Sequence, residues 1–364
     1  MSLVINSFPP LPIGVKNGVG GVIGNKLYVG LGSAGTRLFF YDLDAPIKGW
    51  QRASEFPGTT RDGAAFSVCD DKLYVFSGAG QPENSTTPIV LEDSYVYEAK
   101  RNRWQSIETK IPVGLLGASM CQIDAEKLGC FGGYDKETFD HFVAEISQID
   151  PAQQPEKHQA TLTKFMSRPA QDYGWNQTIW LFDCANETWS EVGRNPYLAN
   201  CGAGVIQQNN TVTLIEGEIK PGLRSLESKA FEFDNGDMSN NRLLSSICHA
   251  DSSHEGLAGH FVGQVEKQII VAGGAYFIGS QNNLQKGQWY SHQGLTKHYD
   301  NKVWRFDGTT WHQVMLLPHG TAYGVSISHN NTMYLLGGED SKGDAQSQCY
   351  TLSWRTLFPP IKNS

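Results

Sequence analysis

The sequence predicts an all-β fold, a six-bladed β-propeller, on three observations. A short apolar strand that ends in glycine recurs six times, at Leu27–Gly32, Leu73–Gly78, Leu128–Gly133, Val212–Gly217, Ile269–Gly274 and Met333–Gly338. The final glycines are 46, 55, 84, 57 and 64 residues apart, and the shortest spacing is close to the ~50 residues of one type of propeller blade. Four copies are followed by an aromatic strand and then a tryptophan, at Trp50, Trp104, Trp189 and Trp311. Each unit therefore predicts one four-stranded antiparallel blade, and we expect residues 1–364 to form a single domain.

The fourth copy is the weakest match. Its aromatic strand, Phe231–Asp234, has no tryptophan in the matching place, so the outer strand of this blade is the least well defined.

The two ends of the chain predict how the ring closes. The last unit has three clear strands that end near Trp354, whereas the opening segment Val4–Pro12 is typical of the end of a blade. We expect the N-terminal segment to supply the outer strand of the sixth blade, because this removes an open sheet edge. The alternative donor, Thr356–Ile361, contains two prolines that disfavour a place in a strand ladder.

The long interval between the third and fourth glycine strands predicts an insertion of about residues 136–175. It is polar and contains three prolines, and Pro155–Met166 is its best candidate for a helix. A solvated loop is the common interpretation, but loops this long in a compact domain are often lids or binding elements. In a propeller such loops tend to lie at one mouth of the central channel.

Composition and charge limit the classes of partner that the protein can have. A net charge of −8 and a pI near 5.7 provide no electrostatic footprint for nucleic acid, and no apolar run approaches the ~20 residues that span a bilayer. We therefore expect neither nucleic acid nor membrane as a partner. The seven scattered cysteines include no CxxC pair, and their odd number argues against a full disulfide framework while leaving one or two bridges open.

The segment Glu216–Arg224 concentrates four ionisable side chains directly after a buried strand. In a propeller the glycine-ended strand lies near the axis, so the residues after it face the channel mouth, and Pro221–Gly222 predicts a turn that brings Arg224 back toward Glu218. A carboxylate beside a guanidinium, shielded from water, suits an anionic substrate on which a proton must move. A purely structural ion pair is the alternative interpretation.

Glu216 complicates this picture. Consecutive strand residues face opposite sides, so Glu216 and Glu218 would share a face in a regular strand, and one pKa would be raised. The other expectation is that Gly217 breaks the alternation.

The segment Gly217–Arg224 resembles the hallmark of the bacterial sialic acid mutarotases, the N-acetylneuraminate epimerases, which are six-bladed kelch-type propellers. The resemblance covers nearly the whole chain, and its other motifs are Gly30–Thr36, Phe56–Gly58, Arg61–Asp62, Asp172–Tyr173, Asn176, Tyr290–Leu295 and Ala322–Ser326. The Gly-Gly pairs are generic to kelch repeats, whereas the lysine-proline-glycine-leucine-arginine turn and the histidine-containing loop of the fifth blade are more particular.

The resemblance implies an isomerase that interconverts α- and β-N-acetylneuraminate by opening and closing the sugar ring. The family's proposed catalytic pair falls on Glu218 and Arg224, with Glu218 moving the proton and Arg224 gripping the carboxylate or stabilising oxygen charge. Such a reaction requires neither a redox cofactor nor a metal. The resemblance also implies a periplasmic location, with the cytoplasm left open, and a homodimer is among the assemblies that the sequence allows.

Six further residues are candidates for substrate binding: Arg61, Tyr173, Asn176, His292, Tyr323 and Glu339. Each also has an ordinary interpretation, since an arginine after a turn often holds blades together and aromatic residues in propellers mostly pack between blades. Glu339 occupies the point of the sixth repeat that Glu218 occupies in the fourth.

Three other classes are less well supported. A copper-radical oxidase of the galactose-oxidase type needs ordered histidine and tyrosine ligands, and the ten histidines show no such spacing. A hydrolytic sialidase would carry repeated aspartate boxes, of which Asp307–Trp311 is a faint echo. A noncatalytic kelch-type propeller that binds carbohydrate or protein remains the main alternative.

Overall fold

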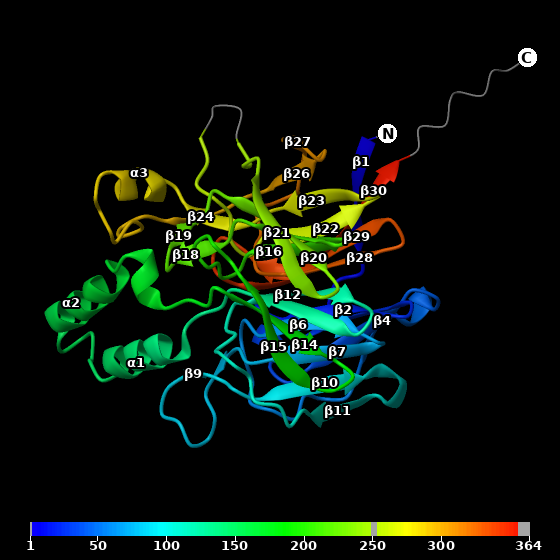
Figure 1. Cartoon of the computed structure of the whole chain (residues 1–364), viewed down its shortest axis with the longest axis horizontal. Coiled ribbons are helices and arrows are strands. Elements are labelled where there is room, and N and C mark those ends of the chain that lie inside the picture. The colour runs from blue at the N-terminus through cyan, green and yellow to red at the C-terminus, as the bar shows by residue number, and fades with distance from the viewer. Residues whose placement is uncertain (1, 249–252, 356–364) are drawn as a thin grey trace, which may run out of the picture.

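The computed structural model, which describes residues 2–248 and 253–355, is a ring of six four-stranded antiparallel sheets, as the sequence predicts (Figure 1). The first three blades, from the axis outward, are β2 (Val19–Ile23), β3 (Lys26–Gly30), β4 (Leu38–Asp42), β5 (Trp50–Arg52); β6 (Ala65–Cys69), β7 (Lys72–Phe76), β10 (Ser94–Glu98), β11 (Arg103–Ser106); and β12 (Ser119–Asp124), β13 (Lys127–Phe131), β14 (Thr178–Asp183), β15 (Thr188–Arg194). The last three are β16 (Gly204–Gln208), β17 (Thr211–Ile215), β20 (Ser228–Asp234), β21 (Asp237–Leu244); β22 (Phe261–Val265), β23 (Gln268–Ala272), β26 (Lys302–Phe306), β27 (Trp311–Leu316); and β28 (Val325–His329), β29 (Thr332–Glu339), β30 (Ala345–Arg355), β1 (Ser2–Phe8).

The second strand of each blade forms the core. In β7 and β23 every position after the first is buried. Because a blade is packed between two neighbours, both faces of this strand are covered, and apolar residues occupy consecutive positions instead of alternating.

The recurring tryptophan occupies one register position of the outer strand, opposite an aromatic residue of the third strand. The pairs are Tyr41 with Trp50, Tyr97 with Trp104, Phe182 with Trp189 and Phe306 with Trp311. In the fourth blade Met238 pairs with Phe233 at this position and packs against the same core. Methionine fills the place that tryptophan takes in β5, β11, β15 and β27, so β21 forms without the sequence signal that marks those four outer strands.

The N-terminal strand closes the ring, as predicted. β1 pairs with β30 along its whole length, from Ser2 opposite Arg355 to Phe8 opposite Cys349. The alternative donor, Thr356–Ile361, lies outside the described residues.

A cyclic set of backbone hydrogen bonds joins the blades at the axis. Six residues with φ between 51° and 69° take part, namely Asn17, Gly63, Gly117, Gly202, Gly259 and Tyr323. Each donates its N–H to the carbonyl of the equivalent residue one blade earlier, at 2.6–3.2 Å, and Asn17 donates to Tyr323, so the set is closed. We call this set the neck ring.

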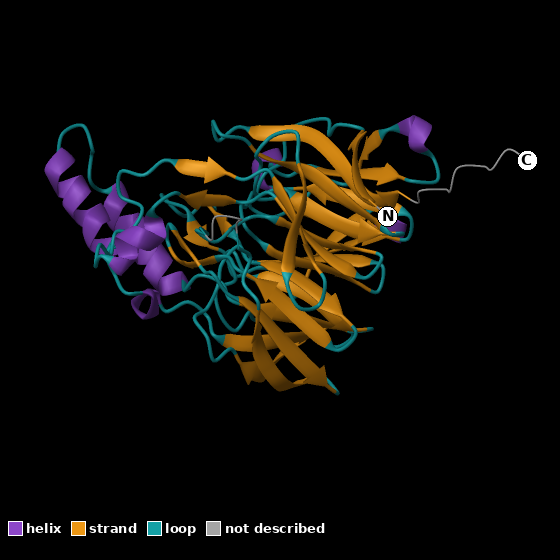
Figure 2. Cartoon of the chain, turned by 90° about the horizontal axis from the view of Figure 1, so that it is seen from above, coloured by secondary structure: helices purple, strands orange, loops and turns teal. Residues whose placement is uncertain are grey.

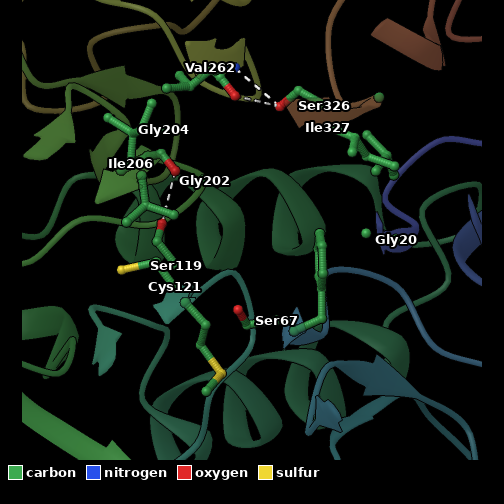
Figure 3. A pocket seen from close by; sticks show the side chains of 18 of the residues that line it. Gly20, Ser67, Ser119, Cys121, Gly202, Gly204, Ile206, Val262, Ser326 and Ile327 are labelled. Carbon is green, nitrogen blue, oxygen red and sulfur yellow. Dashed lines mark hydrogen bonds between the residues drawn. The ribbon is translucent and has the colours of Figure 1, made fainter. Parts of the chain in front are cut away.

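The neck ring divides the axis into a channel and a mouth. Residues that follow the ring line a channel of about 470 Å³. Figure 3 shows Ser119 and Ser326 in this channel, where their hydroxyls donate to Ala203 O and Val262 O of the neighbouring blades, each at 2.8 Å. Residues that precede the ring pair with the segment after a glycine strand, as Cys201 pairs with Glu218. The ionisable segment of the fourth blade therefore lies at the mouth, across the ring from the channel.

The insertion lies on the mouth side. It contains α1 (Lys136–Ser147) and α2 (Pro155–Met166). The bounds of α2 are those that the sequence predicts, whereas no helix is predicted at α1. Asp135 begins α1 by accepting a hydrogen bond from Thr138 N at 2.7 Å. Figures 1 and 2 show the helices projecting from one side of the ring, the side on which α3 (Ser280–Gln285) and the short strands β18 (Glu218–Lys220) and β19 (Leu223–Arg224) lie.

Two other short hairpins lie on the mouth side. They are formed by β8 (Ala79–Gly80) with β9 (Ile89–Val90) and by β24 (Ala275–Phe277) with β25 (Lys297–Tyr299). Six of the seven cysteines are free thiols, at Cys69, Cys121, Cys130, Cys184, Cys201 and Cys349.

Candidate active site

The β18–β19 hairpin brings Glu218 and Arg224 together. The two residues are register partners, and Gly222 in the turn between them has a φ of 78°, which glycine adopts without strain. Glu218 also exchanges two backbone hydrogen bonds with Cys201, next to the neck ring. The sequence prediction that the Pro221–Gly222 turn returns Arg224 to Glu218 is confirmed.

The two side chains form an ion pair at the mouth. Arg224 Nη1 lies 2.8 Å from Glu218 Oε1, which also accepts a 3.3 Å hydrogen bond from Gly222 N. The side chain of Glu218 is 19% exposed and that of Arg224 is 1% exposed. Glu218 is thus the member of the pair that solvent or a substrate reaches.

Two hydrogen bonds and one aromatic ring fix the side chain of Arg224. Its Nε donates to Ala275 O at 2.9 Å and its Nη2 to the Tyr323 hydroxyl at 3.4 Å, while the guanidinium lies over the ring of Phe277 at 5.1 Å. Nη1 forms the ion pair with Glu218 and carries two N–H groups, and within residues 2–248 and 253–355 it has no further acceptor. One N–H of this buried arginine is therefore not engaged by the ion pair and lies beside Glu218.

Gly217 breaks the strand alternation, so Glu216 and Glu218 do not share a face. With Glu216 at a φ of 49° and Gly217 at 87°, Glu216 turns into the interior. Its carboxylate accepts a 2.7 Å hydrogen bond from Leu257 N and pairs with His254. Burial raises the pKa of Glu216, and the neighbouring His254 opposes that rise. Glu216 is a buried support of the hairpin and does not reach the mouth.

Lys220 ties the hairpin to both surrounding loops. Its buried ammonium donates to Arg168 O of the insertion at 2.6 Å and to Trp289 O of the fifth-blade loop at 2.7 Å. Burial lowers the pKa of Lys220 to about 8. Lys220 thus links the insertion to the fifth-blade loop, two segments that are far apart in the sequence.

The fifth-blade loop is fastened to the site by a second set of contacts. Glu255 accepts hydrogen bonds from Gly279 N and Gln281 N at the start of α3, at 2.6 and 3.0 Å. The side chain of Gln281 then donates to Arg224 O at 2.9 Å. This loop fixes the backbone of the arginine as well as covering it.

Of the predicted substrate-binding residues, His292 and Tyr323 lie at the site. His292 packs against the hairpin turn, and burial, together with Arg224 and Lys220, lowers its pKa to about 4. It is therefore neutral at neutral pH. Tyr323 belongs to the neck ring with a φ of 60°, an uncommon conformation for a bulky residue that is found at functional sites. Burial raises its pKa to about 12, so its hydroxyl stays protonated.

Three others are engaged in structural contacts. Arg61 is buried and binds both oxygens of Asp93, at 2.7 and 3.0 Å. Asn176 donates to Gly132 O and Thr178 O, each at 3.0 Å. Tyr173 is fully buried and donates to Phe165 O at 2.6 Å. A role for these three in substrate binding remains a prediction.

Glu339 lies at the mouth within a cluster of its own. Its carboxylate contacts Lys16 Nζ at 2.6 Å and Lys297 Nζ at 2.7 Å and accepts a hydrogen bond from the Tyr299 hydroxyl. Burial alone would raise the pKa of Glu339, but the hydrogen bonds from the two lysines and Tyr299 outweigh it and lower the pKa to about 2.

Sequence reasoning missed Tyr134. This residue follows the third glycine strand directly, as Glu218 follows the fourth, and its hydroxyl donates to Glu218 Oε2 at 3.3 Å. Burial, followed by the charge of Glu218, raises the pKa of Tyr134 well above its usual value, so it remains a donor. The sequence signal that could have identified Tyr134 is its position directly after the third glycine strand, which matches that of Glu218 after the fourth.

Residues 2–248 and 253–355 contain no group of three or more histidine, cysteine, aspartate or glutamate side chains that could hold a metal ion. Within the same residues no helix is long and apolar enough to cross a membrane.

The fold and the site together define a kelch-type propeller that carries a carboxylate–guanidinium pair at one mouth. The family model of the N-acetylneuraminate epimerases matches residues 8–357, and the chain belongs to that family. It is 38% identical to the N-acetylneuraminate epimerase of Vibrio vulnificus over 96% of this chain and 91% of the relative. It is 50% identical to a Kelch domain-containing protein of Vibrio cholerae over 97% of this chain and 99% of the relative. The solved structure of YjhT superposes with a TM-score of 0.90 at 30% identity, covering 96% of this chain and 98% of the other.

Proposed function

We propose that this protein is an N-acetylneuraminate epimerase, a sialic acid mutarotase that converts α-N-acetylneuraminate to the β anomer. The observation that carries the proposal is the Glu218–Arg224 pair, in which a partly exposed carboxylate rests on a buried guanidinium at the mouth of the propeller. Family membership supports the same reaction and the same substrate.

The chemistry is a transfer of protons without net oxidation. Glu218 takes the proton of the anomeric hydroxyl, the bond between the anomeric carbon and the ring oxygen breaks as the hydroxyl oxygen becomes the carbonyl, and Glu218 returns the proton to the ring oxygen to leave the open keto form. Rotation about the carbon chain presents the other face of the carbonyl. Ring closure then reverses the proton transfers. Arg224 Nη1, beside Glu218, stabilises negative charge on the oxygen as it develops.

Proton NMR of freshly released α-N-acetylneuraminate tests the proposal. Catalytic amounts of protein near neutral pH should accelerate formation of the β anomer beyond the buffer rate. Glu218→Gln and Arg224→Ala should each reduce that acceleration ~100-fold or more, because each removes a group that acts on the reacting oxygens.

Glu232→Gln is the matched control. Glu232 pairs with Arg242 in the outer strands of the same blade, away from the mouth, so its loss should leave the rate unchanged. Wild-type turnover in Glu218→Gln or Arg224→Ala would remove that residue from the mechanism. A folded wild-type protein without acceleration would favour the noncatalytic sugar-binding propeller.

The identity of the sugar acid needs its own comparison. The 50% identical relative carries only a domain name, and it comes from the same Vibrio cholerae strain as a second relative, 37% identical, named N-acetylneuraminate epimerase. The same NMR assay with a second sialic acid that differs in the N-acyl group would show which acid is turned over faster. Periplasmic location and a homodimer also remain predictions, for cell fractionation and for sedimentation to test.

A further inference from the structure

An anionic substrate needs a cation that it can reach, and Arg224 is poorly placed for this. Its side chain is 1% exposed, and its Nε and Nη2 are already engaged with Ala275 O and the Tyr323 hydroxyl. A sugar carboxylate would have to displace Glu218 to form two parallel bonds with it. The remaining donor of Arg224 suits the reacting oxygen better than the carboxylate.

The surroundings of Glu339, in the sixth blade, offer positive charge at the same mouth. Lys16 and Lys297 share the single carboxylate of Glu339, which is ionised throughout the neutral range because its pKa is about 2. Both lysine side chains are partly exposed, at 26% and 32%. One positive charge of this cluster is therefore not balanced by Glu339.

The neighbours of the two lysines show which ammonium has fewer carboxylates around it. Lys16 interacts electrostatically with a second carboxylate, that of Asp62, and its ammonium also donates to Gly343 O at 2.5 Å. Lys297 has Glu339 and, beneath its ammonium, the rings of Tyr299 and Tyr323 at 5.0 and 4.8 Å. Aromatic rings attract an ammonium without neutralising it.

A short chain of contacts connects Lys297 to the catalytic pair. Its ammonium lies over the ring of Tyr323, whose hydroxyl accepts from Arg224 Nη2, and Arg224 contacts Glu218. Tyr323 contacts Lys297 through its ring and Arg224 through its hydroxyl, and therefore lies between the two clusters.

We propose that Lys297 binds the carboxylate of the substrate, with Tyr323 as the floor between this subsite and Glu218. The inference rests on the proposed function and adds a binding residue to it. Glu339 holds the Lys297 ammonium in place through their 2.7 Å contact. Arg224 is then left to act on the reacting oxygen.

The test combines a protein change with a substrate change. Lys297→Met should raise KM for N-acetylneuraminate ~10- to 100-fold, the value of a charge-assisted bond, with kcat within about threefold. For the wild type, the methyl ester of the same sugar should raise KM by a similar factor. For Lys297→Met, the ester and the free acid should have the same KM, since the variant has no ammonium left to distinguish them.

Two variants complete the design. Lys297→Arg keeps the charge and should restore KM to within about fivefold of the wild type. Lys26→Met is the matched control, because Lys26 also pairs with a carboxylate, Asp42, and lies over an aromatic ring, Phe40, but in the first blade away from the mouth. Circular dichroism and the melting temperature verify that each variant is folded.

The outcomes separate the two proposals. If the wild type is active and Lys297→Met still prefers the acid over the ester by the wild-type factor, another group binds the carboxylate and this inference is wrong. If the wild type neither binds nor anomerises the sugar, the proposed function fails and the inference fails with it. Equal KM values for acid and ester in Lys297→Met alone, with Lys26→Met like the wild type, support it.

Discussion

Blades four and six carry a glutamate at the same point of the repeat, in opposite surroundings. Glu218 pairs through its backbone with Cys201, and Glu339 pairs in the same way with Ala322. Yet Glu218 contacts one guanidinium and is 19% exposed, whereas Glu339 contacts two ammonium groups and is 9% exposed. One carboxylate is available for chemistry and the other is saturated with hydrogen bonds.

The comparison shows that the repeat decides where a side chain lies, and its neighbours decide what it does. The cation of Glu218 comes from its own hairpin, six residues along the chain. The cations of Glu339 come from distant parts of the sequence, at separations of 323 and 42 residues. A local pair can be anticipated from a turn motif, and a long-range cluster cannot.

The largest expected difference between the two glutamates is in kcat. Glu218→Gln should lower kcat for anomerisation ~100- to 10,000-fold, because the amide cannot accept the proton. Glu339→Gln should act mainly on KM, because Lys297 loses its charged partner while the proton acceptor stays. Steady-state NMR kinetics on both variants tests this, and a larger loss of kcat in Glu339→Gln than in Glu218→Gln would reverse the roles assigned here.

The turn glycines of the same two hairpins should also differ. A Cβ on Gly222 would lie 1.8 Å from His292 Nδ1, whereas a Cβ on Gly343 would meet nothing within 4 Å. Both glycines have positive φ, 78° and 82°, so each alanine variant carries a conformational cost of about 1 kcal/mol. Gly222→Ala should lose at least ~1 kcal/mol more in free energy of unfolding than Gly343→Ala, because the ring of His292 must move. Urea unfolding measures the free energy of unfolding of both variants. Equal losses would show that the ring of His292 moves away from the new Cβ at no cost.

The sequence predicted the fold well because propeller signals are local. Consecutive apolar positions and a terminal glycine mark each blade without knowledge of its neighbours, and a tryptophan shortly after an aromatic strand marks four of the six. The same reason explains why the outer strand of the fourth blade was hard to predict. Met238 fills the tryptophan position there, and a methionine is not distinctive in the sequence. The helix at Pro155–Met166 was visible from its start at a proline, but α1 depends on Asp135 as a cap, which resembles any loop aspartate.

The site was predictable only in part, for the same physical reason. The Glu218–Arg224 pair follows from one turn, and Gly217 was correctly considered as a break in the strand alternation. Tyr134 was overlooked, although it occupies the matching place of the third repeat, because its bond to Glu218 spans 84 residues. Contacts between blades appear only when the ring closes.

A tyrosine supports each glutamate, and the two hydroxyls should differ in their effect. Tyr134→Phe removes the donor to Glu218 Oε2, so it should lower kcat roughly tenfold, because the reacting carboxylate loses a hydrogen bond that holds it in place. Tyr299→Phe removes a donor to Glu339, which keeps two lysines, and should leave kcat within about threefold of the wild type. Steady-state NMR kinetics on the two variants tests this. An unchanged kcat in Tyr134→Phe would mean that its hydroxyl is only a packing contact.

The smallest expected effect concerns the third residue of each hairpin, buried Lys220 in blade four and exposed Ser341 in blade six. Burial lowers the pKa of Lys220 to about 8, while an unfolded lysine has a pKa near 10.5. Below about pH 8 both states are protonated, and the cost of burying the charge is fully present. Between about pH 8 and 10.5 the unfolded chain binds more protons than the folded protein, so this residue's contribution to the free energy of unfolding rises with pH.

Lys220→Met removes that proton linkage. The free energy of unfolding of the wild type minus that of the variant should therefore increase between pH 7.5 and 9.5, by less than ~1.4 kcal/mol per pH unit. Other lysines and tyrosines that titrate in this range are present in both proteins and cancel in the difference. Urea unfolding at the two pH values measures it, and a flat or falling difference would show that the ammonium of Lys220 keeps an ordinary affinity for its proton between Arg168 O and Trp289 O. An increase would show that Lys220 is a buried charge in the folded protein, whereas blade six has an uncharged serine, Ser341, at the same point.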